Sequence, residues 1–432
     1  MLVKRSFSPL LLLSYSQCKQ GFQPALFATS RKMASSSAGA STAAAPALII
    51  TTVNNTRIIT LNRPSALNSL SLEMCLDIKK ELLKIQTEGS NIGSFIVRGS
   101  GGRAFCAGGD VKSLYMDIVN ARERERRGSS EALDDIGSGK QGVLANDFFR
   151  KEYEMNYLLG TSSVPQVSLW DGIVMGGGVG LSVLGEFRVA TENTLFAMPE
   201  TAIGLFPDVG SSGWLPHLPE GQGLYIGLTG CRLNAADLIS TGIATHFVPS
   251  DMLQLLQDKM TEKCTPDPAT SKDIIKDILG KLSMNKELPG AVEAKATIEK
   301  NREVIKRCFH NKKSIEEIFV SLEAEKASCA EGASAFATTT LATLAKMSPT
   351  SLKVTMHQLE AGRDLDLKGC LEMEFRVMMR SVKAPDFSEG IRALLVDKDN
   401  KPAWTPSAAA AVDEADVAGY FRPLEHVFEL RL

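Results

Sequence analysis

The sequence predicts an α/β layered domain followed by a mainly helical region. Short β-type runs recur in the first part of the chain, at 49–61, 94–98, 167–170 and 187–190. Segments with helical periodicity lie between these runs, and strands that alternate with helices predict layers of helix on sheet. After about residue 250 the apolar residues follow a helical period almost throughout. We therefore expect a core domain over 46–250 and a mainly helical C-terminal region over 251–432.

Residues 1–45 do not have the composition of a folded segment. No Asp or Glu precedes Glu73, whereas Lys, Arg and Ser are frequent, which is the pattern of an organelle transit peptide. The Ala/Ser tract at 34–47 indicates a linker. Arg31-Lys32 before Met33 suits mitochondrial processing, although a plastid address has the same composition. We expect a mitochondrial protein, with a plastid as the alternative.

The first folded elements should be a hairpin and a helix. Asn54-Asn55 between two β-rich runs is a hairpin signal. Ser71 is a candidate N-cap for a helix whose apolar residues continue at helical spacing to Ile85. A short strand and a glycine-rich turn then lead to FCAGGD at Phe105–Asp110.

A charged segment at 119–146 follows this motif. It is rich in Arg, Glu, Ser and Gly, so we interpret it as a solvated loop or mobile insertion, with a lid over a substrate as the alternative. A helix should start within 147–156, where an inward face would place Glu152 among its aromatic neighbours. A surface position for Glu152 is an equally good interpretation.

The stretch from Trp170 to Gly213 holds the features that favour chemistry. Three consecutive glycines, Gly176–Gly178, precede an apolar segment, Val179–Leu184, that we expect to be a buried helix. Without a Cβ the backbone approaches a ligand closely, and the unpaired N–H groups of a helix start favour an anion. A tight turn explains the same pattern. Neither a P-loop nor a dinucleotide fingerprint is present.

Two carboxylates follow in the same apolar stretch. Glu200 comes after Pro199 and Asp208 after Pro207, at positions that favour a turn or a helix start. Acids are rare in such surroundings unless they are paired, hydrogen-bonded or used, although Glu is also an ordinary choice in a first helical turn. Two carboxylates in unlike environments can act as one base and one acid or binding group.

Composition excludes several function classes. The 432 residues are 44% hydrophobic and carry a net charge of −2, which is no signature of nucleic-acid or membrane binding. The 8 cysteines form no C-x-x-C pair and the 5 histidines have no ligand spacing, so we expect neither a disulfide framework nor a metal site. No apolar run reaches the ~18 residues that span a bilayer.

Several motifs resemble the crotonase (enoyl-CoA hydratase/isomerase) superfamily. They are FCAGGD at Phe105–Asp110, MGGGVGLS at Met175–Ser182, FAMPETAIGLFPDVG at Phe196–Gly210 and the late segment Asp386–Trp404. The similarity runs from about Ile49 to Phe421. It implies a crotonase-like spiral of β-β-α repeats with a C-terminal helical region. It also implies an acyl-CoA substrate and no separate cofactor, because CoA is part of the substrate.

The resemblance implies roles for individual residues. The amides of Ala107 and Gly177 match the oxyanion hole that binds a thioester carbonyl, where one donor is typically worth ~10²–10³ in rate. Hydratases of the family carry two glutamates, of which the first position is Gly180 here and the second is kept as Glu200. Asp208 stands where hydratases usually have glycine. This combination is typical of the hydroxyacyl-CoA hydrolase branch.

This branch hydrolyses short 3-hydroxyacyl-CoA thioesters, and the leading substrate is 3-hydroxyisobutyryl-CoA of valine breakdown. Glu200 would attack the thioester or activate a water. Asp208 would bind the 3-hydroxyl or give a proton to the departing thiol, and Glu152 would line the acyl pocket. Two departures from the family pattern are Ser65, where many relatives have a basic residue near the CoA phosphate, and the less glycine-rich Gly210–Leu218.

Two alternatives stay open. The protein could be a hydratase/isomerase or a hydrolase of another acyl-CoA, although Gly180 argues against a hydratase. It could also be a structural subunit of the mitochondrial ribosome, since relatives of this branch are built into some of them, and the Arg-rich segment at 122–127 would then contact RNA. Oligomer contacts of the helical region are a further expectation from related proteins.

Overall fold

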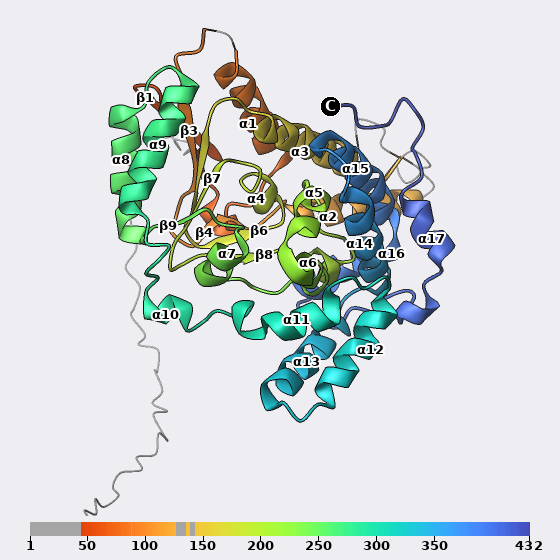
Figure 1. The fold of residues 1–432 in the computed structure, drawn as a ribbon. Helices are drawn as coiled ribbons and strands as arrows, with labels where there is room; N and C mark the ends of the chain where they lie inside the picture. The colour runs from red at the N-terminus through yellow and green to blue at the C-terminus, as the bar shows by residue number, and fades with distance from the viewer. Residues whose placement is uncertain (1–44, 88, 127–134, 139–142) are drawn as a thin grey trace, which may run out of the picture. The chain divides into compact units, whose positions relative to one another are not determined.

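Two β-sheets organise the described part of the chain, which comprises residues 45–87, 89–126, 135–138 and 143–432 of the computed structural model (Figure 1). The strands are β1 (Leu48–Val53), β2 (Thr56–Leu61), β3 (Ser94–Gly99), β4 (Ala104–Cys106), β5 (Gln166–Trp170), β6 (Ile173–Met175), β7 (Phe187–Ala190), β8 (Leu195–Ala197) and β9 (His246–Phe247). The larger sheet has the order β1-β2-β3-β5-β7-β9 and the smaller has the order β4-β6-β8. β1 and β2 pair antiparallel, and all other neighbours are parallel.

Helices connect and cover these sheets. Before residue 250 they are α1 (Leu72–Ile85), α2 (Val111–Arg126), α3 (Leu144–Gly160), α4 (Gly177–Gly180), α5 (Ser211–Trp214), α6 (Gln222–Thr229) and α7 (Ala235–Thr241). After it they are α8 (Leu253–Lys263), α9 (Pro268–Leu282), α10 (Gly290–Glu293), α11 (Arg302–Phe309), α12 (Ile315–Lys326), α13 (Glu331–Leu344), α14 (Pro349–Gly362), α15 (Leu367–Lys383), α16 (Pro385–Ile391) and α17 (Glu414–Tyr420). Shorter elements near the site are the 3₁₀ turn η2 (Glu200–Ile203) and a π-helix, η7 (Arg392–Val396).

Consecutive strand pairs give the fold its spiral. β3, β5 and β7 enter the larger sheet, and each is followed at once by a strand of the smaller sheet, β4, β6 or β8. Helical segments then lead to the next pair, α2 and α3 after β4, and α4 after β6. This is the β-β-α repeat that the sequence motifs imply, so the fold prediction is confirmed.

Local sequence signals account for the first elements. Val53 pairs with Thr56 across Asn54-Asn55, and Asn54 adopts the left-handed conformation (φ 51°) that a two-residue hairpin turn requires. The Ser71 side chain accepts a hydrogen bond from Met74 N at the start of α1, which satisfies one of the free N–H groups of the first turn. The hairpin and N-cap predictions are therefore confirmed.

The prediction of a loop over 119–146 is wrong for its first part. Residues up to Arg126 continue α2, because Leu114, Ile118 and Ala121 form a buried stripe at helical spacing. Residues 144–146 already belong to α3. Residues 135–138 form a turn, as predicted, and 127–134 and 139–142 lie outside the described residues. The transit peptide predicted for 1–45 also lies outside them except for its last residue.

The helix predicted over Val179–Leu184 is shorter in the structure. It corresponds to α4, which ends at Gly180. Beyond it Val183 N still donates to Val179 O at 2.7 Å, but Ser182 N donates to Val179 O and Gly185 N to Ser182 O, three residues back, as in a turn. After Trp404 the chain forms a 3₁₀ turn at Ala409–Ala411 and then α17.

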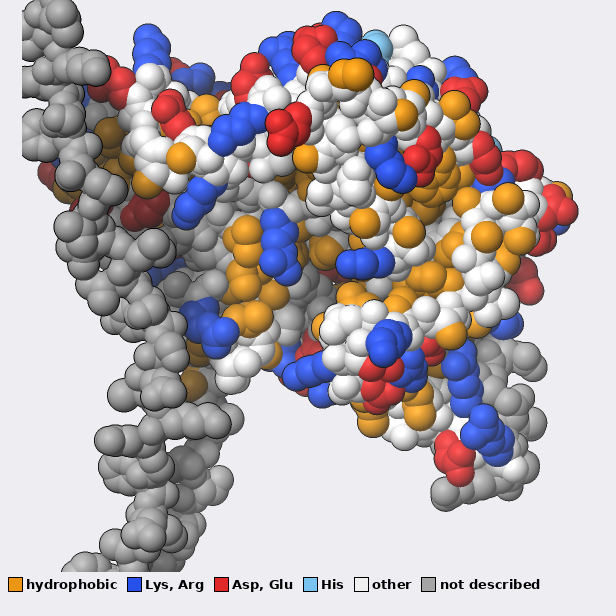
Figure 2. Space-filling model, turned by 90° about the horizontal axis from the view of Figure 1, so that it is seen from below, with side chains coloured by type: hydrophobic (Ala, Val, Ile, Leu, Met, Phe, Trp, Pro, Cys, Tyr) orange, Lys and Arg blue, Asp and Glu red, His pale blue; other side chains and the backbone are white. Residues whose placement is uncertain are grey.

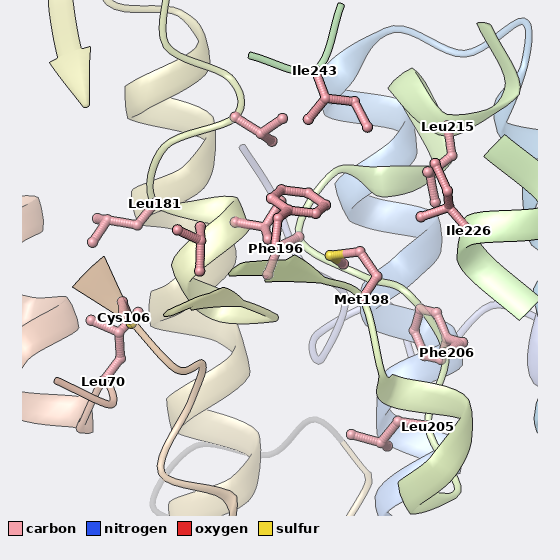
Figure 3. Packing of buried hydrophobic residues seen from close by; sticks show 14 of the residues in the cluster. Leu70, Cys106, Leu181, Phe196, Met198, Leu205, Phe206, Leu215, Ile226 and Ile243 are labelled. Carbon is pink, nitrogen blue, oxygen red and sulfur yellow. The ribbon is translucent and has the colours of Figure 1, made fainter. Parts of the chain in front are cut away.

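Buried side chains form one cluster on each face of the larger sheet. Along β3, Ile96 joins the cluster under α8 and α9, while Phe95 and Val97 join the cluster on the opposite face, as alternation along a strand requires. The larger cluster continues around Phe196, on β8 of the smaller sheet, and Met198, which follows that strand (Figure 3). Helices from beyond residue 250 thus cover the sheet of the first part, and the domain boundary at 250 stays a prediction.

The surface carries no continuous region of one charge on the face seen from below, where hydrophobic side chains lie among Lys, Arg, Asp and Glu (Figure 2). This mixture agrees with the net charge of −2. None of the described helices combines the length and the apolar character that crossing a bilayer requires.

Candidate active site

The carboxyl ends of β4, β6 and β8 place three chain segments side by side. These strands are parallel neighbours and end at Cys106, Met175 and Ala197, so the residues that follow them meet at one edge of the sheet. Those residues are 107–109 after β4, the consecutive glycines after β6, and the segment that leads to Glu200 after β8. The topology alone therefore gathers the motifs that the sequence singles out.

A cavity of about 230 Å³ lies at this edge. Its lining includes the five residues to which the sequence analysis gives roles, Ala107, Glu152, Gly177, Glu200 and Asp208. Glu152 reaches the cavity from α3, and Asp208 reaches it from the loop between η2 and α5. The interpretation of Glu152 as a surface acid is wrong, because this residue is only 2% exposed.

The Ala107 amide is engaged within the protein. Its N–H donates to Leu67 O at 3.0 Å, so it cannot also bind a substrate carbonyl, and its assignment to the oxyanion hole is corrected here. Two residues further on, the Gly109 amide donates to no acceptor within the described part of the chain. Gly109 also lines the cavity, which makes its N–H the candidate donor in place of Ala107.

The Gly177 amide lies next to that of Gly109. A Cβ on Gly177 would be 3.2 Å from Gly109 N and 2.3 Å from Glu152 Oε1, so a side chain here would crowd the Gly109 amide and displace the Glu152 carboxylate, which glycine avoids. Because α4 is a single turn, the individual N–H groups, rather than a helix dipole, would bind an anion. We call Gly109 and Gly177 the oxyanion corner.

Three carboxylates share the cavity, and the ion pairs of the described residues include none of them. Burial raises the pKa of Glu200 well above its ordinary value, and repulsion from Asp208 and Glu152 raises it further. Burial, followed by repulsion from Asp208, likewise raises the pKa of Glu152. Burial raises the pKa of Asp208 to about 7. Near neutral pH such a cluster can provide both an ionised base and a protonated acid.

Two carboxylate oxygens face the cavity unpaired. Glu200 Oε2 and Glu152 Oε1 are buried and have no hydrogen-bond partner among the described residues. A buried acceptor without a partner is unfavourable by ~1–3 kcal/mol. Substrate or water groups that donate hydrogen bonds would therefore be bound favourably at these positions.

Tyr153 fixes the third carboxylate and is a functional residue that the sequence analysis did not single out. Its hydroxyl donates to Asp208 Oδ2 at 2.7 Å, and both groups are buried. This hydrogen bond lowers the pKa of Asp208 against the larger effect of burial. The available signal was its position beside Glu152 in a helix rich in aromatic residues, but spacing does not show that two adjacent residues reach the same acid.

Gly180 occupies the position of the first hydratase glutamate, and the structure leaves no room for that side chain. A Cβ there would lie 2.4 Å from Val209 Cβ. Val209 is fully buried and has a left-handed backbone (φ 55°), which is rare for a β-branched residue. The residue after Asp208 thus fills the space that a second glutamate would need.

The late motif also reaches the cavity. Leu394 and Leu395, on the π-helix η7, line it together with Phe148 and Phe149 of α3. Arg392 anchors this helix through ion pairs with Glu389 at 2.8 Å and Asp399 at 2.8 Å. The two leucines and two phenylalanines supply the apolar part of the cavity lining.

The arginines predicted to contact RNA lie mainly on α2. Arg122, Arg124 and Arg126 belong to this helix, and Arg127 is outside the described residues. Arg126 pairs with Glu123 at 3.8 Å. Ser65, noted as a departure near the CoA phosphate, is exposed on the 3₁₀ turn η1 (Pro64–Ala66).

Comparison with known proteins adds to this geometry. The model of the family described as enoyl-CoA hydratase/isomerase matches residues 56–421. The "3-hydroxyisobutyryl-CoA hydrolase, mitochondrial" of Dictyostelium discoideum is 40% identical over 377 residues, which cover 86% of this chain and 91% of that protein. The protein of the same name from Xenopus laevis is 42% identical over 368 residues, which cover 85% of this chain and 86% of that protein.

Solved structures share the fold. A carnitinyl-CoA dehydratase from Mycobacterium thermoresistibile is 32% identical and superposes with a TM-score of 0.73, covering 89% of this chain and 98% of that chain.

Proposed function

The chain belongs to the enoyl-CoA hydratase/isomerase family, and we propose that it hydrolyses 3-hydroxyisobutyryl-CoA to 3-hydroxyisobutyrate and CoA, the reaction expected in valine breakdown. The relatives that it matches over most of their length are named for this activity. They are also named mitochondrial, so we place this chain in the mitochondrion rather than the plastid.

One observation carries the proposal: the oxyanion corner, Glu200 and Asp208 border a single cavity, while Val209 leaves no room for the first hydratase glutamate at Gly180. Amides can stabilise a thioester oxyanion, and a buried acid beside them can deliver the attacking group. Without the glutamate at position 180 the protein lacks the acid pair on which hydration of an enoyl-CoA depends in this family. Hydrolysis of a thioester is the reaction that the remaining groups support.

The oxyanion corner polarises the thioester. The carbonyl oxygen accepts hydrogen bonds from the Gly109 and Gly177 amides, which stabilise the negative charge that develops when the carbonyl carbon is attacked. One such donor is worth ~10²–10³ in rate. The same donors would stabilise an enolate equally, so the corner by itself does not select hydrolysis.

Glu200 supplies the attacking group. Either its carboxylate attacks the carbonyl carbon and water cleaves the resulting anhydride, or it takes a proton from a water molecule whose oxygen attacks. In both routes one water is consumed, the C–S bond breaks, and the CoA sulfur takes a proton. Asp208, with a pKa raised to about 7 by burial, would deliver that proton or accept a hydrogen bond from the 3-hydroxyl.

The cavity suits a short acyl group. Its volume of about 230 Å³ is small beside the ~300–1,000 Å³ of a pocket for a drug-sized ligand. Leu394, Leu395, Phe148 and Phe149 provide apolar contacts, while Glu152 adds a polar acceptor to the pocket. A branched, hydroxylated acyl group of a few carbons matches both the size and this mixture of surfaces.

A substrate panel tests the proposal. The purified protein is offered acyl-CoAs with and without a 3-hydroxyl, and release of the CoA thiol is followed. We expect kcat/KM to be highest for 3-hydroxyisobutyryl-CoA and at least ~10-fold lower for isobutyryl-CoA, because a buried acceptor would lose its partner. Hydration of an enoyl-CoA without thiol release would contradict the proposal.

Association with the mitochondrial ribosome and formation of a homo-oligomer stay predictions from the resemblance. Co-sedimentation of the protein with ribosomes, compared with its amount in the free matrix, tests the first. Size-exclusion chromatography with light scattering tests the second.

A further inference from the structure

The loop that carries Asp208 is held by two buried side chains that the proposed reaction does not use. We call residues 207–212 the acid loop. Gln358 Nε2, on α14, donates to Pro207 O at 2.5 Å. Gly210 N donates to Glu374 Oε2, on α15, at 2.7 Å, and Ser212 N donates to Glu374 Oε1 at 2.9 Å. The loop is thus fixed on both sides of Asp208.

The acid loop has a conformation that its own sequence does not favour. Val209 follows Asp208 with a φ of 55°, in the left-handed region that β-branched residues rarely enter. A residue keeps such a conformation only where the surrounding structure over-determines it. The flanking hydrogen bonds to Gln358 and Glu374 provide that determination, and they do so through the backbone of the loop.

Glu374 is a costly residue for a purely structural contact. It is 0% exposed, and the ion pairs of the described residues include none with this carboxylate. Its hydrogen-bond donors are two amides of the acid loop and the Ser212 hydroxyl. A carboxylate accepts on both oxygens at once, which an amide side chain cannot do, so the pair of loop amides requires an acid at this position.

The residue after Glu374 on α15 also contacts the hydrogen-bond partner of Asp208. Tyr153, which donates to Asp208 Oδ2, packs edge-on against Phe375 with ring centroids 6.2 Å apart. Phe375 follows Glu374 on α15. One turn of α15 therefore contacts the loop backbone with one residue and the partner of the Asp208 carboxylate with the next.

We propose that Glu374, assisted by Gln358, is a positioning residue that sets the Asp208 carboxylate against the substrate by fixing the backbone of the acid loop. This inference rests on the proposed function and deepens it, because it makes the C-terminal helices part of the catalytic device. Glu374 does not touch the substrate, and its effect on hydrolysis passes through Asp208.

A double-mutant cycle tests this route. The variants are Glu374→Gln, Asp208→Asn and the double variant, and kcat/KM for 3-hydroxyisobutyryl-CoA is measured for each. Misplacement by about 1 Å can cost ~10²-fold, so we expect Glu374→Gln to lower kcat/KM by at least ~30-fold in the wild-type background. In the Asp208→Asn background the same change should cost less than ~3-fold, because the group it positions is already lost.

Matched variants separate positioning from general damage. Glu372→Gln lies on the same helix, and Glu372 contacts Lys368 at 3.9 Å rather than the loop, so it should keep kcat/KM within ~2-fold. Gln358→Met removes the donor to Pro207 O with little change of volume and should show the same dependence on Asp208. If the Asp208→Asn protein has no measurable turnover, the dissociation constant of a non-hydrolysable 3-hydroxyalkyl-CoA thioether is measured for all four proteins and replaces kcat/KM in the cycle.

The outcomes are distinct. Equal losses from Glu374→Gln in both backgrounds would show a structural role and overturn this inference, while hydrolysis by the wild-type protein would leave the proposed function standing. Absence of hydrolysis by the wild-type protein would reject the proposed function and this inference with it.

Discussion

The oxyanion corner and the acid loop border the same cavity, but different forces hold them in place. Backbone pairing holds the corner: Leu70 N donates to Gly108 O at 2.9 Å, and Asp110 N donates to Leu70 O at 2.8 Å. Buried side chains hold the acid loop, and the most distant of them, Glu374, is 164 residues from Gly210 along the chain. The corner is a property of the β-β-α core, whereas the loop depends on α14 and α15.

This difference separates two parts of the chemistry. The corner acts on the carbonyl oxygen, which every acyl-CoA thioester has, so damage to it should affect all substrates alike. The acid loop carries Asp208, which distinguishes this chain from hydratases, so damage to it should depend on the substrate or on pH. The following predictions test that separation.

The largest effect should come from substitution of Glu200, because both the oxyanion corner and the acid loop act together with this residue in the proposed reaction. Glu200→Gln should lower kcat by at least ~10⁴-fold for every acyl-CoA, because it removes the nucleophile or base while keeping the size of the side chain. Thiol release measures the loss, and circular dichroism checks the fold. Glu186→Gln, at an exposed ion pair with Lys272 of 2.8 Å, is the control. Retained turnover in Glu200→Gln would reject the assigned role.

Damage to the oxyanion corner should have the next largest effect, and this effect should not depend on whether the substrate has a 3-hydroxyl. A Cβ on Gly177 would lie 3.2 Å from Gly109 N, and it would also displace the Glu152 carboxylate, whose Oε1 would be 2.3 Å away. Gly177→Ala therefore crowds both donors of the corner and should lower kcat by ~10²–10³-fold. The loss should be equal for 3-hydroxyisobutyryl-CoA and isobutyryl-CoA. Gly280→Ala, where a Cβ meets nothing within 4 Å, is the control. A loss confined to the hydroxylated substrate would contradict the separation.

One of the two corner residues, Gly177, could be predicted from sequence because it lies in a contiguous motif. A parallel sheet then brings the segment after β6 next to the segment after β4, where the other residue lies. The choice between Ala107 and Gly109 could not be made in this way. It depends on which amide pairs with the strand-like segment at Leu67–Leu70, and that pairing is a tertiary contact.

The hydrogen bonds that hold the acid loop could not be predicted from the sequence, for a different reason. Glu374 stands on the apolar stripe of α15 with Cys370 and Met378, and an acid on such a stripe indicates a buried partner. The sequence does not identify the partner, because the hydrogen bonds reach backbone amides of a remote loop. The left-handed backbone of Val209 could not be predicted from the sequence either, since nothing in a valine side chain suggests that conformation.

A smaller, substrate-dependent effect should follow from the loop's own hydrogen bond. Tyr153→Phe removes the donor to Asp208 Oδ2, which lies 2.7 Å away, and a hydrogen bond to a charged group is worth ~1.5–3 kcal/mol, or ~10–10²-fold. We expect kcat/KM for 3-hydroxyisobutyryl-CoA to fall by that factor and that for isobutyryl-CoA to fall less. Tyr157→Phe on the same helix is the control. Equal losses for both substrates would place Tyr153 outside the route through Asp208.

The smallest effect should be a shift in pH dependence that links the acid loop to Glu200. Burial raises the pKa of Glu200, and repulsion from Asp208 raises it further. Since Glu200 must be ionised to attack or to act as a base, kcat/KM should rise with pH along an acidic limb. Asp208→Asn removes a negative charge, so Glu200 ionises at lower pH and the limb moves to lower pH. Profiles for isobutyryl-CoA over about pH 5 to 9 measure this shift. A limb that stays in place would show that Glu200 titrates independently of the acid loop.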